Sequence, residues 1–193
     1  MKIVLASTSP YRRELLQRLR VPFDVLAPAV DEARRPGESP LALALRLAEA
    51  KATEVARRRP DDIVIGSDQV AELDGEPIGK PHTHDAALAQ LERMQGRRLV
   101  FHTALAVVAH GHAVVESVPT AVTFRRLDRD SLEAYLRSDQ PYDCAGAAKI
   151  ESLGIALVER VESDDPTALI GLPLIRLTAM LAAAGVPVLG AAR

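Results

Sequence analysis

The segment Ile63–Val70 constrains the fold more than any other stretch, because a run of β-branched residues leads directly into Gly66, Ser67 and Asp68. A short β-branched run closed by small residues predicts a buried strand that ends in a tight turn. In open α/β sheets, ligands bind just beyond the carboxyl ends of such strands. We therefore expect Asp68 to stand at a functional site, although the same residues could form only a polar turn in which Asp68 binds its own backbone.

Composition limits the kind of protein that this can be. The 193 residues are 48% hydrophobic and 26% charged, which is typical of a globular protein. The length suits one domain or two closely packed lobes, and we expect a single domain over residues 1–193. The net charge of −2 argues against a nucleic-acid partner and against a membrane-surface partner, because binders of both kinds normally carry a basic excess.

The sequence also gives expectations about location. The single cysteine, Cys144, argues against an internal disulfide and a cysteine-rich metal site, and it fits a reducing compartment. The apolar run Met1–Ala6 is too short to indicate a signal peptide. No apolar stretch approaches the about 18 residues that cross a bilayer. We therefore expect a cytoplasmic protein.

A strand followed by a helix start predicts an anion site near the beginning of the chain. Ile3–Ala6 has the pattern of a buried strand, and Ser9 and Pro10 have the positions of a helix cap and a first helical residue. The free N–H groups at such a junction, with the positive end of the helix dipole, suit a phosphate. Arg12 and Arg13 fall in the first turn, where cations are disfavoured unless an anion compensates them. They indicate either that anion or ordinary surface arginines.

Lys51 interrupts the apolar face of a helix predicted over Leu41–Arg58. It shares one side of that helix with Ala48 and Val55, because residues three and four positions apart lie on one face. Its ammonium either reaches the edge of the core or projects into a cleft, where it would act as a point charge for phosphate.

Two loops add further charged candidates. The proline-rich segment 27–40 follows a short strand predicted at Phe23–Leu26, and it carries Asp31 and Glu32. These carboxylates are either solvated or oxygen ligands for a hard divalent cation. Lys80 lies between a glycine and a proline, and therefore in a constrained loop.

The rest of the chain alternates strand-like and helix-like segments. Turn residues predict hairpins at Asp74-Gly75 and at His110-Gly111-His112. His82 and His84 lack a nearby third ligand and are a weak metal pair. We expect, in order, a helix over 86–94, strands over 99–109 and 113–125, a helix over 131–136 capped by Ser131 or Asp130, and a strand over 155–161. A final helix is opened by Gly171-Leu172-Pro173 and runs to about Ala184. This mixture indicates an α/β fold with a mixed sheet.

Taken together, the charged candidates point to phosphate chemistry. Lys51, Lys80 and the arginines of the first helix can hold phosphates, while Glu32 and Asp68 can hold Mg²⁺ and orient water. No glycine-rich P-loop occurs, so an ordinary ATPase is not predicted. The residues by themselves therefore indicate a phosphate-handling α/β enzyme.

Six strings of residues, in chain order, resemble the Maf family of nucleoside triphosphate pyrophosphatases. The strings are Leu5–Leu16, Val30–Glu32, Ala50–Ala52, Gly66–Val70, Gly79–Pro81 and Gly171–Leu174. The triplet Ser67-Asp68-Gln69, with Lys149 and Glu151, is similar to the branch that hydrolyses 7-methyl-GTP, whereas the other main branch prefers dTTP and UTP. The resemblance implies two lobes around a long, mixed, twisted sheet with flanking helices and a central cleft, as in inosine triphosphatase-like folds. It also implies a homodimer, with the long strands as a possible contact.

The resemblance further implies the reaction and the residues that perform it. Cleavage between the α- and β-phosphates would yield a nucleoside monophosphate and pyrophosphate, with Mg²⁺ or Mn²⁺ required. Asp68 would be the general base, and Glu32 with Asp68 would bind the metal. The triphosphate would be held by Ser7, Arg13, Lys51 and Lys80, which also offset charge in the transition state.

Three further residues would set base specificity. Tyr11 would stack on the 7-methylguanine base, whose positive charge adds a cation–π contribution of about 0.5–2 kcal/mol. Glu151 would accept both N–H groups of the guanine Watson–Crick edge. Gln69 carries both a donor and an acceptor for the remaining base edge. The chain departs from the branch at Tyr11, where tryptophan is frequent, and around Lys149.

Two alternatives remain open from the sequence. The same reaction could act on dTTP, UTP or another noncanonical nucleotide, which Gln69 and Glu151 argue against. The chain could instead be a nucleotide-binding regulator, for instance of cell division, although such a sensor would not need the base Asp68.

Overall fold

The computed structural model describes residues 1–190 and contains a mixed, seven-stranded sheet. The strands are β1 (Ile3–Ala6), β2 (Phe23–Leu26), β3 (Ile63–Leu73), β4 (Glu76–Ile78), β5 (Arg98–Ala109), β6 (His112–Phe124) and β7 (Val158–Glu162). Their order in the sheet is β2-β1-β3-β5-β6-β7, and β4 pairs separately with β3. Strands β1, β2 and β3 are parallel, while β3, β5, β6 and β7 pair antiparallel. The predicted α/β fold with a mixed sheet is thus confirmed.

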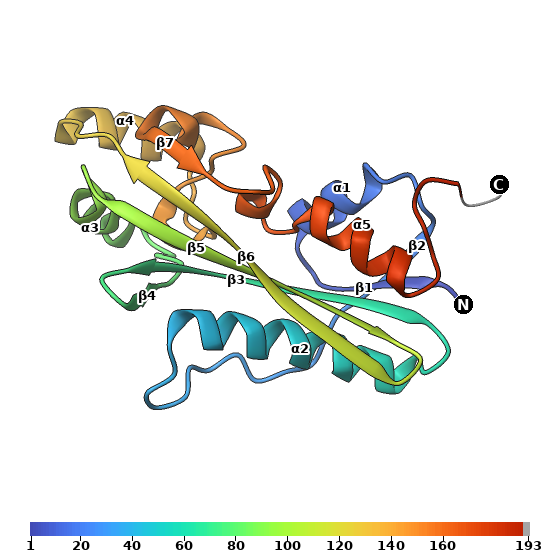
Figure 1. Ribbon diagram of the computed structural model, residues 1–193. Helices are drawn as coiled ribbons and strands as arrows, with labels where there is room; N and C mark the ends of the chain where they lie inside the picture. The colour runs from blue at the N-terminus through green and yellow to red at the C-terminus, as the bar shows by residue number, and fades with distance from the viewer. Residues whose placement is uncertain (191–193) are drawn as a thin grey trace.

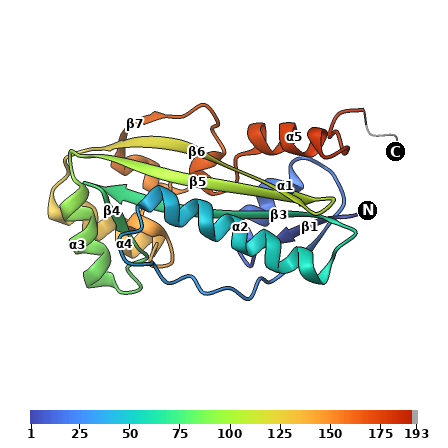
Figure 2. The same cartoon turned by 60° about the horizontal axis from the view of Figure 1, so that its bottom comes forward.

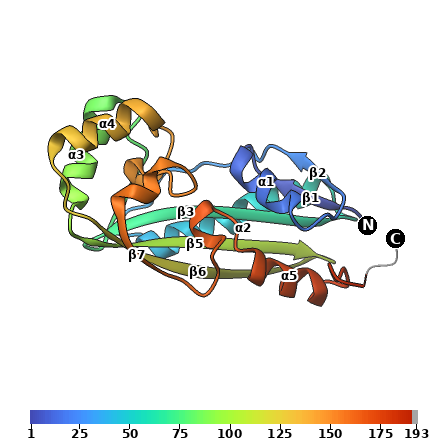
Figure 3. The same ribbon diagram turned by 90° about the horizontal axis from the view of Figure 1, so that it is seen from above.

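Helices cover both faces of this sheet. They are α1 (Pro10–Gln17), α2 (Pro40–Arg58), α3 (His84–Met94), α4 (Arg129–Asp139) and α5 (Leu174–Ala183), with short 3-10 turns η1 (Ala145–Ala147), η2 (Leu153–Leu157) and η3 (Ala168–Ile170). Helix α2 lies along one face of the long strands, and α1 and α5 lie on the other (Figures 1 and 2). Helices α3 and α4 gather at the opposite end of the long strands from α1 (Figure 3).

The alternation of side chains along β3 explains this layering. Val64 packs in a core with α2, whereas Ile63 and Ile65 pack in a second core with α1 and α5. A third core, around Phe101, Val122 and other residues at the far ends of the long strands, is covered by α3 and α4. Of the helices in residues 1–190, none is long and apolar enough to cross a membrane.

Several local predictions are confirmed. Ser9 caps α1, where its side chain accepts from the Arg12 N–H, and Pro10 is the first helical residue. The two-residue turn Asp74-Gly75 joins β3 to β4, and both residues have positive φ, as a tight hairpin turn requires. A second tight hairpin at His110-Gly111 joins β5 to β6.

The predicted turn at Gly66-Ser67-Asp68 is wrong, because β3 runs without interruption through Asp68 to Leu73. Gly66 is needed for a different reason. A Cβ at Gly66 would lie 2.3 Å from the carbonyl oxygen of Ala48 and 2.7 Å from the backbone nitrogen of Ala52. The small residue therefore allows the backbone of α2 to approach the sheet.

Two further predictions need correction near the C-terminal half. The cap of α4 is Asp128, whose carboxylate accepts from the Ser131 N–H at 2.8 Å, rather than Asp130 or Ser131. The first part of the strand predicted over 155–161 forms η2 instead. A Cβ at Gly154 would lie 2.4 Å from the Lys149 carbonyl oxygen, so the chain doubles back on itself before β7 begins.

Candidate active site

The candidate site lies at a gap in the sheet beside β3. On this edge, β1 pairs with β3 only as far as Ala6 opposite Gly66, and β4 pairs from Ala71 onward. In the described part of the chain, no strand therefore pairs with residues 67–70 on that side. Ligands in open α/β sheets bind beyond the carboxyl ends of parallel strands, and Asp68 lies beyond that end of the neighbour β1 rather than at the end of its own strand β3.

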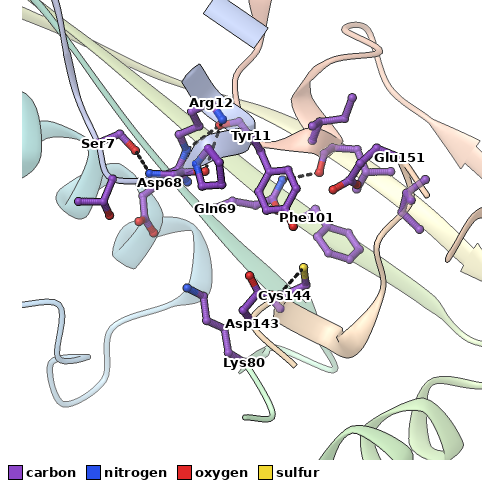
Figure 4. A pocket seen from close by; sticks show the side chains of 18 of the residues that line it. Ser7, Tyr11, Arg12, Asp68, Gln69, Lys80, Phe101, Asp143, Cys144 and Glu151 are labelled. Carbon is purple, nitrogen blue, oxygen red and sulfur yellow. Dashed lines mark hydrogen bonds between the residues drawn. The ribbon is translucent and has the colours of Figure 1, made fainter. Parts of the chain in front are cut away.

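A pocket of about 420 Å³ occupies this gap (Figure 4). Because neighbouring residues of a strand face opposite ways, Asp68 reaches it from the α2 face and Gln69 from the other face. Eight of the sequence-predicted site residues line the pocket: Ser7, Tyr11, Glu32, Lys51, Asp68, Gln69, Lys80 and Glu151. The structure brings residues from the two ends of the chain together here.

Lys51 connects the two candidate acidic residues. Its Nζ lies 2.7 Å from Asp68 Oδ1 and 2.9 Å from Glu32 Oε1. Lys51 and Asp68 are buried, whereas the Glu32 side chain is 59% exposed. Of the two readings of Lys51 from the sequence, the structure supports an ammonium that projects into a cleft. The second Asp68 oxygen, Oδ2, accepts no hydrogen bond from residues 1–190 and remains available to a ligand.

Arg12 is a pocket residue that the sequence did not single out from its neighbour. Its Nε donates to the Gly171 carbonyl oxygen at 2.9 Å, and it lines the pocket. Burial lowers the pKa of Arg12, while the nearby carboxylates Asp68 and Glu32 act in the opposite direction. Arg13 is exposed and lines neighbouring hollows with Gln17 and Val25, not this pocket. Helical geometry could have indicated that only one of the two arginines enters the pocket, because adjacent residues point about 100° apart and cannot both face one spot.

Ser7 and Lys80 approach the pocket from two loops. Ser7 is buried between β1 and α1, and its Oγ accepts the Ser9 N–H at 3.1 Å, so the hydroxyl lies at the start of α1. Lys80 is exposed, and its side chain extends toward the pocket (Figure 4). The Gly79 carbonyl accepts from the Gln90 side chain at 3.1 Å, which ties this loop to α3.

Tyr11 and Lys149 meet at the far side of the pocket. The Lys149 Nζ lies 5.8 Å from the centre of the Tyr11 ring, within the range of a cation–π contact. Burial raises the pKa of Tyr11, so the phenol stays protonated at neutral pH. Glu151 is exposed and follows two residues after Lys149, whose backbone N–H donates to the Tyr135 hydroxyl at 3.0 Å. Helix α4 therefore anchors the segment that carries Glu151.

Several further pocket residues were not predicted as site residues from the sequence. Phe101 is buried in the floor, and Asp143 and Cys144 form part of the wall near η1 (Figure 4). Burial raises the pKa of the Cys144 thiol to about 12, so this thiol is neutral. No sequence pattern marked these positions, because only the long-range packing of β5 and η1 brings them to the pocket.

The donor set fits a hard divalent cation bound with a substrate. Among residues 1–190 no group of three or more histidine, cysteine, aspartate or glutamate side chains could hold a metal ion alone. Glu32 and Asp68 both direct an oxygen at the same Lys51 ammonium, so they already share one cation. Mg²⁺ is commonly held by one or two carboxylates together with substrate phosphates and water, which is the arrangement that this pair can supply.

Comparison with known proteins identifies the family of this chain. The family model described as "Maf-like protein" matches residues 2–184. A protein named "7-methyl-GTP pyrophosphatase" from Albidiferax ferrireducens is 57% identical over 98% of this chain and 96% of its own length. Proteins of the same name from Polaromonas sp. and Thiobacillus denitrificans are 60% and 59% identical, over 95% and 97% of this chain and 85% and 94% of their own lengths. Because the family model matches nearly the whole chain, and relatives of 57–60% identity align with it over almost their full length, this chain belongs to the Maf-like protein family.

Proposed function

We propose that this chain is a nucleoside triphosphate pyrophosphatase that hydrolyses 7-methyl-GTP to 7-methyl-GMP and pyrophosphate. The observation that carries the proposal is the buried Asp68 carboxylate, held 2.7 Å from Lys51 in a pocket that Arg12 and Lys80 also line. The full-length relatives named for this activity support the same substrate. In this proposal residues 1–193 act as one Maf-like domain, and the cleft between the lobes at the two ends of the sheet holds the substrate.

Asp68 acts as the general base. The Lys51 ammonium bonds Oδ1 and fixes the rotamer of the carboxylate, while Oδ2 is left to accept a proton from water. The hydroxide equivalent formed in this way attacks the α-phosphorus, and the bond to the bridging oxygen of the β-phosphate breaks. Pyrophosphate leaves with that electron pair, and the nucleoside monophosphate remains.

Positive charge around Asp68 holds the triphosphate and stabilises the transition state. Lys51 and Arg12 bring buried or half-buried charge close to the base, and Lys80 adds an exposed ammonium on the other side of the cleft. Ser7 adds a hydroxyl at the start of α1, where helix N–H groups favour an anion. Arg13 stays a predicted phosphate residue that would have to act from the neighbouring hollow.

We propose that Glu32 and Asp68 hold Mg²⁺ or Mn²⁺ together with the substrate phosphates. Such an ion supplies Lewis-acid stabilisation of the charge that develops on the phosphate oxygens. The 59% exposure of the Glu32 side chain leaves this carboxylate free to move toward an arriving ion.

The base binds at the end of the cleft that contains Tyr11, Gln69 and Glu151. The Tyr11 ring supplies a stacking surface, and the Glu151 carboxylate accepts from the N–H groups of the guanine edge. Both residues line the same pocket as Asp68, so base and phosphates can be held by one continuous surface.

The decisive experiment measures pyrophosphate release by the purified protein with Mg²⁺. The panel comprises 7-methyl-GTP, GTP, dTTP, UTP and CTP, with Asp68→Asn as the blank. We expect 7-methyl-GTP to lead by tenfold or more in kcat/KM, which is about 1.4 kcal/mol of transition-state discrimination. If dTTP or UTP leads, the substrate assignment is wrong but the reaction assignment stands. If no nucleotide is hydrolysed, the proposal that this chain is an enzyme is wrong.

Two properties complete the proposal. We infer a cytoplasmic location and a homodimer, in line with the family resemblance and with the long strands β5 and β6 as the contact. Light scattering of the purified protein measures the dimer directly, and a monomeric mass would contradict it.

A further inference from the structure

Gln69 and Thr103 form a cross-strand pair beneath the base end of the pocket. They stand directly opposite each other in the antiparallel β3–β5 ladder, so their side chains share one face of the sheet. Thr103 is fully buried, whereas Gln69 is half-buried and lines the pocket. The loop from Asp165 to Gly171, which includes η3, covers the same face, and its Ala168 carbonyl contacts both residues.

The hydrogen bonds around this pair fix the orientation of the Gln69 amide. Gln69 Nε2 lies 3.0 Å from the carbonyl oxygens of Ala168 and Leu169, which can only accept hydrogen bonds. It also lies 2.9 Å from Thr103 Oγ1. Thr103 donates its own proton to the Ala168 carbonyl at 2.8 Å, so its oxygen is left to accept from Gln69. The nitrogen of the amide must therefore face the loop.

The opposite atom of the amide is left for the pocket. In the described part of the chain, Gln69 Oε1 accepts no hydrogen bond, and it is not among the side-chain atoms that are both buried and unpaired. The expectation that Gln69 offers both a donor and an acceptor to the base therefore needs correction. Its NH₂ group is already hydrogen-bonded within the protein, so only its oxygen is available to a ligand.

The loop that holds the amide is itself fixed. Asp165 is 2% exposed and accepts from the backbone N–H groups of Thr167 and Ile175 at 2.9 and 2.7 Å. The Gly171 carbonyl accepts from Arg12 at the other end of the loop. Because both ends are tied, the carbonyls of Ala168 and Leu169 cannot easily turn away to let the amide rotate.

We propose that Thr103 is a specificity-positioning residue, which together with the two loop carbonyls makes Gln69 an obligate hydrogen-bond acceptor toward the base. This inference rests on the proposed function and deepens it. The base end of the pocket then presents the Gln69 oxygen and the Glu151 carboxylate, and both are acceptors. Guanine offers N1–H and a 2-amino group on one edge. Uracil and thymine offer a single N–H flanked by two carbonyl oxygens, which two acceptors would leave unsatisfied.

The test compares Thr103→Val, which removes the hydroxyl at nearly constant volume, with Thr103→Ser, which keeps it. We expect Thr103→Val to lower the preference for 7-methyl-GTP over UTP by about tenfold, through a higher KM for 7-methyl-GTP and a kcat within about twofold of the unmodified protein. Thr103→Ser should retain the preference. Unchanged selectivity in a folded Thr103→Val protein overturns the inference, as does equal loss in both variants, which would indicate a merely structural role.

A substrate analogue keeps the inference testable if Thr103→Val does not fold. The unmodified protein should hydrolyse 7-methyl-ITP, which lacks the 2-amino donor, at least tenfold less efficiently than 7-methyl-GTP. Equal efficiency for the two would overturn the inference, and with it the proposed contact of Glu151 with the 2-amino group, but it would leave the pyrophosphatase reaction intact. If the unmodified protein hydrolyses no 7-methyl-GTP, the proposed function fails first and the inference fails with it.

Discussion

The Lys51 ammonium lies 2.7 Å from Asp68 Oδ1, and the same nitrogen lies 2.9 Å from Glu32 Oε1. One lysine on α2 therefore pairs with a strand carboxylate and a loop carboxylate together. The close approach of α2 to Gly66 makes this contact possible. The position of the Lys51 charge in the pocket is consequently coupled to the packing of α2 on the sheet.

Lys51→Met and Lys80→Met should separate stability from activity. Both remove one ammonium from the pocket, so we expect each to lower kcat/KM by about 10²-fold. Only Lys51 is buried and paired, so only Lys51→Met should lower the free energy of unfolding, by about 1–3 kcal/mol. Urea unfolding and steady-state kinetics measure the two effects. Equal stability of both variants would argue against the structural importance of the Lys51–Asp68 pair.

Arg12→Met and Arg13→Met test which arginine serves the triphosphate. Arg12 lines the pocket and bonds Gly171, while Arg13 lies outside it. We expect Arg12→Met to lower kcat/KM at least tenfold more than Arg13→Met, because only the first removes charge from the site. Thermal melts of both proteins control for folding. A larger loss of kcat/KM in Arg13→Met would instead support Arg13, the residue predicted from the sequence, as the arginine that binds the triphosphate.

Gly66→Ala should destabilise the protein and weaken catalysis. A Cβ at this position would collide with the Ala48 carbonyl oxygen, so α2 must shift away from β3 and take Lys51 with it. We expect a loss of about 1–3 kcal/mol in unfolding free energy. Gly79→Ala is the matched control, since nothing lies within 4 Å of its added carbon. Its stability should stay within about 0.5 kcal/mol of the unmodified protein. Similar losses in both variants would contradict close packing at Gly66.

Arg46 should control the titration of Glu38 in the loop that carries Glu32. The Arg46 side chain holds the pKa of Glu38 at about 2, and it also donates to the Ala33 carbonyl at 3.0 Å. A carboxyl with a depressed pKa stabilises the fold at pH values above its ordinary pKa of about 4.3. That stability is lost as the pH falls toward 2. A carbon-detected NMR titration should place the Glu38 midpoint near 2, and Arg46→Met should return it toward the ordinary value. An unchanged midpoint in the variant would remove Arg46 as the cause.

Glu32→Gln should weaken metal binding without unfolding the protein. The Glu32 side chain is largely exposed, yet it shares the Lys51 ammonium with Asp68. Losing this carboxylate should reduce Mn²⁺ affinity, measured by calorimetry with a nonhydrolysable nucleotide present, by about tenfold or more. Asp31→Asn is the neighbouring control, because its Oδ1 accepts the Ala33 N–H at 2.9 Å and does not line the pocket. Equal affinities for all three proteins would place the metal elsewhere.

Much of the fold could be predicted from local sequence. Ser9 before Pro10, and Asp74 before Gly75, act through hydrogen bonds and backbone angles of adjacent residues, so the α1 cap and the β3–β4 turn needed no further information. The periodic apolar residues of α2 likewise predicted a helix with Lys51 on its buried face. The prediction failed where a small residue is compatible with two different roles, a tight turn or close packing. Gly66 was interpreted as a turn residue, but it accommodates a helix.

The sequence by itself determined the secondary structure near strong local signals, the phosphate-handling residue types and the family. Tertiary structure alone decided that Arg12 rather than Arg13 enters the pocket, and that Gln69 presents only its oxygen. Both outcomes depend on the loop around Gly171, which is 159 residues from Arg12, and whose Ala168 carbonyl is 99 residues from Gln69. Contacts across such separations arise only when the sheet and its covering loops assemble. A residue's type can therefore be known from the sequence while the atom that it offers to a substrate cannot.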